Sequence, residues 1–171
     1  MPRILLIGAP GSGKSSVGKA LARELNATFQ DTDATIVSNS GKSIVEIFKE
    51  DGETGFRKIE REIVLDAISS EIDIVSLGGG AVLDVGVQGA IRECGRTVVY
   101  LQVGVRNAHA RIGAKGDRPL VAQNPEKQWR DLMIIREPIY KSLCSITIFT
   151  DNRKPHEVAH DLVLKMGITH E

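Results

Sequence analysis

The sequence predicts an α/β fold in which helices cover both faces of a parallel sheet. Two observations lead to this expectation. Short apolar runs alternate along the chain with segments of helical periodicity. The runs are dense in Ile and Val without an alternation of polar residues, which is typical of parallel strands buried on both faces. No internal repeat and no Pro/Gly-rich linker divides the 171 residues, so we expect a single domain over residues 1–171.

The expected strands are four clear apolar runs and one weaker run. The first run leads directly into a glycine-rich loop, which indicates a buried first strand rather than a signal sequence. The clear runs are Ile4–Ile7, Ile72–Leu77, Thr97–Leu101 and Ile146–Phe149, and the weaker one lies near Thr28–Gln30.

Apolar residues at helical spacing predict helices between these strands. In the second helix, Glu60 and its charged neighbours lie off the apolar stripe, and in the third we expect Pro138 to limit the helix. Residues 113–124 are polar and without a period, so we expect a mobile loop that can act as a lid. The apolar stripes are Val17, Leu21, Leu25; Phe56, Ile59, Ile63, Ala67; Trp129, Leu132, Met133, Ile135; and Val158, Leu162, Met166.

The composition excludes several classes of protein. Lys and Arg together number 22, as do Asp and Glu, so nucleic-acid binding through bulk positive charge is not expected. No apolar run approaches the roughly 18 residues of a membrane helix. Two cysteines, Cys94 and Cys144, make neither a disulfide scaffold nor a zinc site. We therefore expect a cytoplasmic protein without a nucleic-acid or membrane partner, and the balanced charge favours a monomer.

The residues Gly8-Ala9-Pro10-Gly11-Ser12-Gly13-Lys14-Ser15 fit the phosphate-binding pattern G-x-x-x-x-G-K-[ST] between an expected strand and an expected helix. Glycines let successive N–H groups turn towards phosphate oxygens, and the helix N-terminus adds positive potential. Lys14 can reach the β- and γ-phosphates, and the Ser15 hydroxyl can ligate Mg²⁺. The motif predicts a nucleotide site, and the residues expected around its phosphates are Gly11, Ser12, Gly13, Lys14, Ser15 and Ser16.

The class of nucleotide-binding protein follows from what accompanies this loop. A guanine-specific N-K-x-D motif is absent from the sequence, and the run Ile72–Leu77 ends in Gly78-Gly79-Gly80 rather than in an acid. A carboxylate for the Mg²⁺ side is therefore expected from Asp31 or Asp33. Two alternatives stay open: the two acids can instead cap a helix, and the three glycines can form a plain turn rather than approach a ligand.

Three arginines complete the candidate site. The planar guanidinium of Arg grips a carboxylate through two hydrogen bonds, so Arg57 and Arg136 suit an acidic small molecule. Arg118 lies in the expected mobile loop and can neutralise charge on a transferred phosphoryl group. Each also has an ordinary alternative as a surface or helix-terminal charge.

The motifs named so far, in this order and spacing over nearly the whole chain, resemble those of shikimate kinases. The resemblance implies a three-layer α/β/α P-loop NTPase fold with a five-stranded parallel sheet, a substrate-binding helical region at about 33–61 and a lid at about 112–125. It implies transfer of the γ-phosphoryl group of ATP to the 3-hydroxyl of shikimate with Mg²⁺, a step towards aromatic amino acids. The alternatives are a kinase for another small metabolite and a nucleotide-binding module without activity.

The resemblance also implies a role for each site residue. Asp33 contacts the acceptor hydroxyls and acts as base, while Lys14 and Arg118 act on the phosphates. Asp31 helps Ser15 to organise Mg²⁺. The shikimate-binding positions are Asp33, Arg57, Gly78, Gly79, Gly80 and Arg136, and the positions around adenine are Arg111, Arg153 and Pro155.

Overall fold

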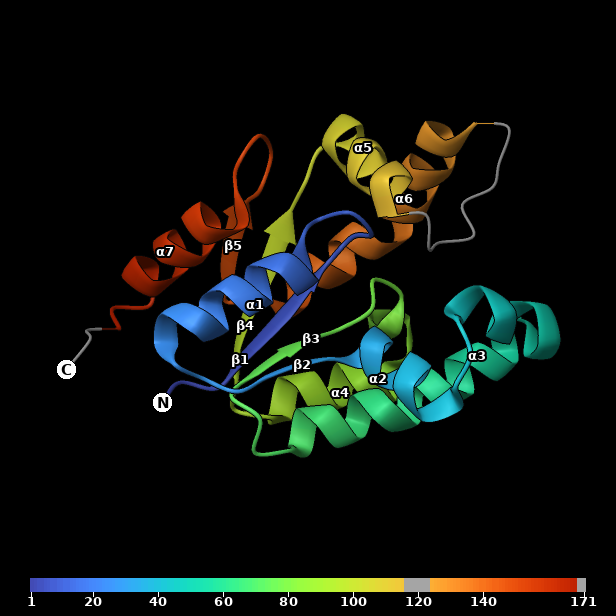
Figure 1. Ribbon diagram of the computed structural model, residues 1–171, viewed down its shortest axis with the longest axis horizontal. Coiled ribbons are helices and arrows are strands. Elements are labelled where there is room, and N and C mark those ends of the chain that lie inside the picture. Colours follow the sequence, from blue (N-terminus) through green and yellow to red (C-terminus); the bar gives the residue numbers. More distant parts are fainter. Residues whose placement is uncertain (116–123, 169–171) are drawn as a thin grey trace.

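The computed structural model describes residues 1–115 and 124–168, and its centre is a sheet of five parallel strands (Figure 1). The strand order is β2-β3-β1-β4-β5. In register, Leu5 of β1 lies opposite Val75 of β3 and Val98 of β4. The strands are β1 (Ile4–Gly8), β2 (Phe29–Asp31), β3 (Ile74–Ser76), β4 (Thr97–Gln102) and β5 (Ile146–Phe149). The predicted strands are confirmed, although β3 is shorter than the apolar run that predicted it.

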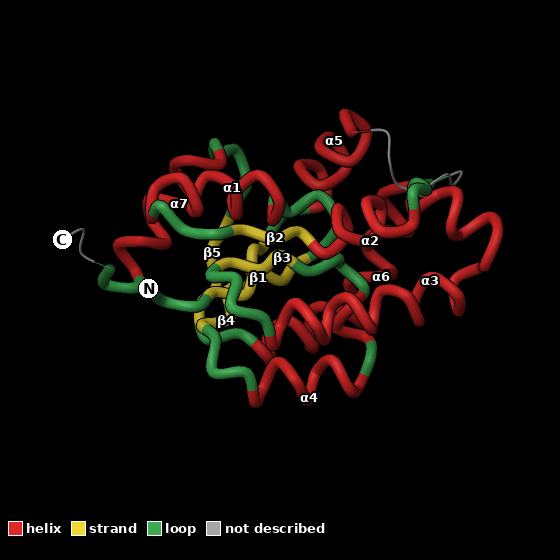
Figure 2. Tube along the Cα trace, turned by 60° about the horizontal axis from the view of Figure 1, so that its bottom comes forward, coloured by secondary structure: helices red, strands yellow, loops and turns green. Residues whose placement is uncertain are grey.

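Helices cover both faces of this sheet, which confirms the three-layer α/β/α arrangement (Figure 2). On one face lie α1 (Lys14–Leu25) and α7 (Pro155–Lys165), and on the other lie α3 (Ile44–Ser69), α4 (Val85–Glu93) and α6 (Pro125–Leu143). Three further elements, α2 (Thr32–Ser40), η1 (Ala81–Leu83) and α5 (Val105–Lys115), follow β2, β3 and β4, respectively.

The alternation of side chains along β1 divides the hydrophobic core into two halves. Ile4 and Leu6 pack towards α1 and α7, whereas Leu5 and Ile7 pack towards α3, α4 and α6. All four side chains are fully buried. Because β1 is central and covered on both faces, the loop that follows it starts from a rigid position.

The helix that contains Pro138 does not stop there. We expected Pro138 to limit it, but α6 continues to Leu143, so that expectation is wrong. Proline removes the hydrogen bond to the carbonyl of residue 134, and Ile134 lies on the exposed side of the helix, where water can satisfy that carbonyl. Burial of Tyr140 and Leu143 then keeps the last turns on the core.

The expected loop at residues 113–124 is in part helical. Gly113 belongs to α5, and Asn124 accepts a hydrogen bond from Lys127 N as the N-cap of α6. Residues 116–123, which include most of the expected lid, lie outside the described residues.

The expected substrate-binding region at 33–61 is occupied by α2 and the first part of α3. A capping box between Ser43 and Glu46 starts α3. Gly52 interrupts α3 with φ 70° and ψ −177°, so α3 consists of two helical segments that meet in a kink at this residue.

Candidate active site

The loop between β1 and α1 curls tightly enough to require glycine. Gly11 and Gly13 have φ values of 79° and 90°, in the left-handed region. A Cβ on Gly11 would also lie 2.6 Å from the carbonyl oxygen of Ala108 in α5. The loop therefore brings its backbone N–H groups to the N-terminus of α1, which is a favourable place for phosphate.

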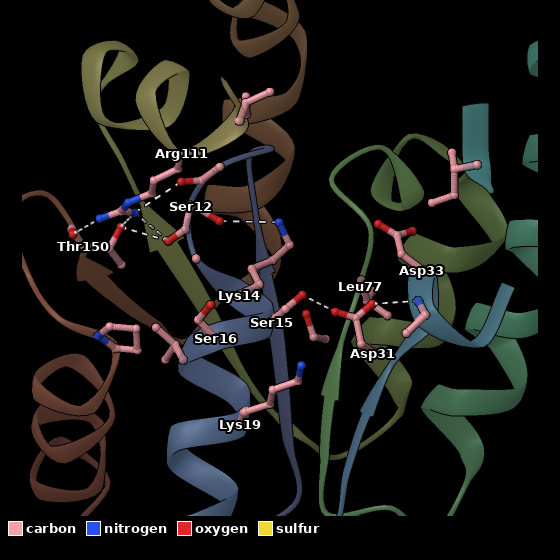
Figure 3. A pocket seen from close by; sticks show the side chains of 18 of the residues that line it. Ser12, Lys14, Ser15, Ser16, Lys19, Asp31, Asp33, Leu77, Arg111 and Thr150 are labelled. Atoms are coloured by element: carbon pink, nitrogen blue, oxygen red, sulfur yellow. Dashed lines mark hydrogen bonds between the residues drawn. The ribbon is translucent and has the colours of Figure 1, made fainter. Parts of the chain in front are cut away.

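Lys14, the first residue of α1, directs its side chain back over the loop (Figure 3). Its ammonium donates hydrogen bonds to Gly8 O at 2.8 Å and to Ala9 O at 3.0 Å, and it is 3.4 Å from Ser12 Oγ. The residue is only 5% exposed. Oxygen acceptors of the loop thus hold the positive charge at the phosphate-binding loop, where phosphate oxygens can take their place.

Ser15 and Asp31 meet across the cavity that faces this loop. The Ser15 hydroxyl donates a hydrogen bond to Asp31 Oδ2, and the other carboxylate oxygen of Asp31 accepts one from Ala34 N at 3.1 Å (Figure 3). Asp31 is therefore the N-cap of α2, one of the two expected alternatives, and it is also a hydrogen-bond partner of the phosphate loop.

Thr32, which separates the two acids, fixes their directions. It is fully buried, and its hydroxyl donates to Ser76 O at 3.2 Å and accepts from Gly78 N at 3.3 Å. This side chain ties the start of α2 to the end of β3. Asp31 consequently faces α1, while Asp33 lies beside Gly78, where an added Cβ would be 2.7 Å from Asp33 Oδ1.

The glycine segment after β3 also lies against an arginine. A Cβ on Gly80 would be 2.7 Å from Arg57 Cζ, so only glycine leaves the guanidinium its present place. Arg57 Nη1 donates to Glu60 Oε1 at 2.7 Å. The glycine segment therefore lies in close contact with protein side chains, and Arg57 is a partly buried neighbour of it.

Glu60 is a site residue that the sequence analysis missed. It was expected off the apolar stripe, but it is 3% exposed, because it lies one turn after Phe56 and one turn before Val64 on the buried face of α3. That spacing was the available signal. Burial raises the pKa of the Glu60 carboxyl, and the positive charges of Arg57 and Arg136 only partly oppose this.

Arg136 of α6 is buried, with an exposed fraction of 7%. Its Nε has no hydrogen-bond partner among the described residues. Together with Arg57 and Glu60 it forms a cluster of two cations and one buried anion, and the carboxylate of Asp33 lies beside this cluster.

A cavity of about 1030 Å³ extends from Asp33 past the phosphate loop to α7. Its volume suits a nucleotide-sized ligand. Among the residues predicted for the nucleotide and the metal, the cavity is lined by Gly11, Ser12, Gly13, Lys14, Ser15, Ser16, Asp31, Arg111, Arg153 and Pro155. The acceptor-side residues Arg57, Gly78, Gly79, Gly80 and Arg136 do not line it; they adjoin it behind Asp33.

Arg111 connects the far end of the cavity to the phosphate loop (Figure 3). Its guanidinium donates to Gly11 O at 3.2 Å, to Ser12 O at 3.3 Å and to Thr150 Oγ1 at 3.0 Å. Thr150, which the sequence analysis missed, itself donates to Ser12 O at 2.9 Å. Arg153 is held by Asp161 of α7. The helix α5 and the loop after β5 are thereby joined to the phosphate loop.

A magnesium ion fits the oxygen pair of Ser15 and Asp31. Mg²⁺ prefers hard oxygen ligands and commonly takes only one or two carboxylates, with water and phosphate completing its shell. Across residues 1–115 and 124–168, no group of three His, Cys, Asp or Glu residues could hold a metal.

Arg118 lies outside the described residues. Within the same ranges, no helix is long and apolar enough to cross a membrane.

Comparison with known proteins gives a consistent result. The family model for shikimate kinase matches residues 10–166. A shikimate kinase of Streptomyces coelicolor is 43% identical over 157 residues, covering 92% of this chain and 91% of that protein, and one of Thermobifida fusca is 43% identical over 164 residues, covering 96% and 94%. The solved structure of an Acinetobacter baumannii shikimate kinase in complex with shikimate aligns with a TM-score of 0.92 at 32% identity, covering 100% of this chain and 96% of that one.

Proposed function

Because the chain belongs to the shikimate kinase family, we propose which of its residues carry out the ATP-dependent transfer of a phosphoryl group to the 3-hydroxyl of shikimate. The products are shikimate 3-phosphate and ADP. The observation that carries the proposal is the position of Asp33, which lines the nucleotide cavity and also adjoins the cluster of Arg57, Glu60 and Arg136.

On the nucleotide side, the backbone N–H groups of the phosphate loop and the Lys14 ammonium bind the phosphates. The Lys14 ammonium already donates hydrogen bonds to the carbonyl oxygens of Gly8 and Ala9, so it binds phosphate by exchanging these acceptors for phosphate oxygens. Arg111, Arg153 and Pro155 line the cavity at the end away from Asp33 and surround the adenine. Arg118, which lies outside the described residues, adds positive charge to the phosphates.

On the acceptor side, Arg57 and Arg136 bind the shikimate carboxylate, because a guanidinium group can grip a carboxylate through two hydrogen bonds and the Arg136 Nε has no partner among the described residues. The backbone of Gly78, Gly79 and Gly80 allows the ring to approach closely. Asp33 then accepts the proton of the attacking hydroxyl, which is the role of a general base.

Ser15 and Asp31 would hold Mg²⁺, and the bound ion would supply charge neutralisation of the transferred phosphoryl group. Positioning of the two substrates accounts for the remaining catalysis, since phosphoryl transfer needs little covalent help from the protein. We also propose that the enzyme acts in the cytoplasm, because its two cysteines make no disulfide scaffold, and that it is a monomer, because its charge is balanced.

The deciding experiment is a coupled assay of ADP release with Mg-ATP, with and without shikimate. We expect strong stimulation by shikimate, loss of activity when the metal is chelated, and no activity in Lys14→Met. ADP release that shikimate does not stimulate, from protein that binds ATP, would overturn the acceptor assignment. Turnover of another hydroxy acid would then indicate a different small-metabolite kinase, and absence of any turnover would indicate a nucleotide-binding module.

A further inference from the structure

One helix contacts both ligand-binding loops through a single face. Trp129, Arg136 and Tyr140 of α6 are separated by seven and four residues, so they project from the same side of the helix. All three are buried, and Tyr140 is completely inaccessible. In Figure 1, α6 passes behind the loop between β1 and α1. Arg136 lies between two side chains for which the proposed function gives no role.

Trp129 contacts the phosphate loop. Its indole Nε1–H donates a hydrogen bond to Pro10 O at 3.1 Å. A trans peptide is planar, so its C=O and the following N–H point in opposite directions. Fixing the Pro10 carbonyl towards α6 therefore directs the N–H of Gly11 away from the helix, and Gly11 lines the nucleotide cavity.

Tyr140 makes the equivalent contact with the glycine segment. Its hydroxyl donates to Gly79 O at 2.5 Å, and its ring stacks on Tyr100 with centroids 5.2 Å apart. By the same planarity, this bond directs the N–H of Gly80 away from α6, and Gly80 lies against Arg57. The two loops also touch each other, because a Cβ on Gly79 would lie 2.9 Å from Pro10 Cδ.

We propose that Trp129 and Tyr140 are positioning residues. Trp129 orients the peptide between residues 10 and 11, and Tyr140 orients the peptide between residues 79 and 80. Together they hold the phosphate loop and the glycine segment at a fixed spacing on either side of Arg136. The proposal rests on the proposed function for the identity of the acceptor. Each residue acts through a backbone carbonyl of one loop, so each affects one substrate: Trp129 the nucleotide and Tyr140 the acceptor.

Tyr100 offers a matched control for Tyr140. Both rings are fully buried and stacked on each other, but the Tyr100 hydroxyl has no hydrogen-bond partner among the described residues. Tyr140→Phe and Tyr100→Phe remove the same atom from neighbouring places. We expect Tyr140→Phe to raise the KM for shikimate about 3- to 10-fold, as loss of one buried hydrogen bond predicts, with the KM for ATP within about twofold. Tyr100→Phe should leave both constants within about twofold.

The nucleotide side is tested with ADP by calorimetry. Trp129→Phe should raise the ADP dissociation constant about 3- to 10-fold and leave the KM for shikimate unchanged. Met133→Ala, on the same buried face one turn further on, opens a cavity without removing a bond to a loop and should leave ADP binding unchanged. Melting temperatures of all four variants confirm that they fold.

The outcomes test the positioning roles and the proposed function separately. Equal effects of Tyr140→Phe and Tyr100→Phe, or an unchanged ADP dissociation constant in Trp129→Phe, overturn the positioning roles. If the unmodified enzyme does not use shikimate, the proposed function fails, but the ADP measurement on Trp129→Phe and Met133→Ala still decides the inference, because it needs no acceptor.

Discussion

The buried carboxylate of Glu60 accepts a hydrogen bond of 2.7 Å from Arg57 Nη1, three residues earlier on α3. The same carboxylate is close enough to Arg136 and Asp33 for both to influence its pKa. Glu60 therefore makes a direct hydrogen bond to Arg57, one of the two arginines proposed to bind the substrate, and interacts electrostatically with Arg136, the other. We therefore expect Glu60 to affect substrate binding through these groups.

Replacing this carboxylate tests whether it positions the arginines. Glu60→Gln keeps the shape but removes the charge, so Arg57 loses a charge-assisted hydrogen bond. We expect the KM for shikimate to rise about tenfold, while the KM for ATP stays within about twofold. Steady-state kinetics with each substrate varied in turn measure both constants.

Glu53→Gln is the matched control for that variant. Glu53 lies 3.7 Å from Arg57 Nε, but its side chain is 70% exposed, where a salt bridge contributes little. The same change there should leave both KM values unaltered. An increase in the shikimate KM as large as that of Glu60→Gln would show that negative charge near Arg57 matters in general, and not the buried contact.

The raised pKa of Glu60 gives a prediction for stability against pH. An acid whose pKa is higher in the folded chain contributes stability that is complete at low pH and is lost as the pH rises through its folded pKa. The unfolded value is about 4.3. The melting temperature of Glu60→Gln relative to the unmodified chain should therefore increase between pH 5 and pH 8.

Thermal melts of the two proteins across that range measure this difference, and roughly 2–4 °C corresponds to about 1 kcal/mol in a chain of this size. A relative melting temperature that falls with pH would mean that Arg57 and Arg136 outweigh the cost of burial, and would contradict the direction of the Glu60 pKa.

The two contacts of Asp31 can be separated by one substitution. In Asp31→Asn, the amide oxygen can still accept from Ala34 N and cap α2, because Asn is as good an N-cap as Asp. The charge that faces Ser15 is lost. We expect half-saturation with Mg²⁺ to require about 10- to 100-fold more metal, with a melting temperature within about 2 °C.

Mg²⁺ titrations of ADP release and thermal melts decide this case. Asp31→Ala removes the cap as well, so it should lose both metal affinity and stability. An Asn variant with ordinary Mg²⁺ dependence would leave Asp31 with a capping role only.

The fold could be predicted from the sequence because four of the five strands lie in largely apolar runs and the phosphate-binding motif marks the first strand–helix junction. Pro138 shows where such reasoning fails. Sequence alone does not reveal that the carbonyl deprived of its partner belongs to the exposed Ile134. The helices α4 and α5 were not predicted, since α4 contains two glycines and α5 ends in a polar stretch.

Site residues could be predicted only where they belong to a sequence motif in which that residue type has few other structural roles. The phosphate loop meets that condition, whereas the acids at 31 and 33 allowed two interpretations. Glu60 and Thr32 do not meet it, because a glutamate on a charged helix and a threonine between two acids have many ordinary uses. Their roles depend on β3 and α3 lying beside α2, which is a tertiary relationship.

Gly80→Ala tests the close approach of the glycine segment to Arg57. The φ of Gly80 is −94°, so an alanine causes no backbone strain, and its effect must come from the added Cβ. That Cβ would lie 2.7 Å from Arg57 Cζ, which is too short a contact. The flexible arginine must yield, and its hydrogen bond to Glu60 must lengthen or break. We expect the KM for shikimate to rise about tenfold with little change in the KM for ATP.

Gly89→Ala is the matched control, because a Cβ on Gly89 in α4 meets nothing within 4 Å. Alanine is preferred over glycine inside a helix by about 0.5–1 kcal/mol, so this variant should be slightly more stable and have unaltered kinetics. Steady-state kinetics and thermal melts on both variants make the comparison. If Gly80→Ala kept the shikimate KM of the unmodified enzyme, Arg57 could bind substrate from a displaced position, and its present contact with the glycine segment would not be required for binding.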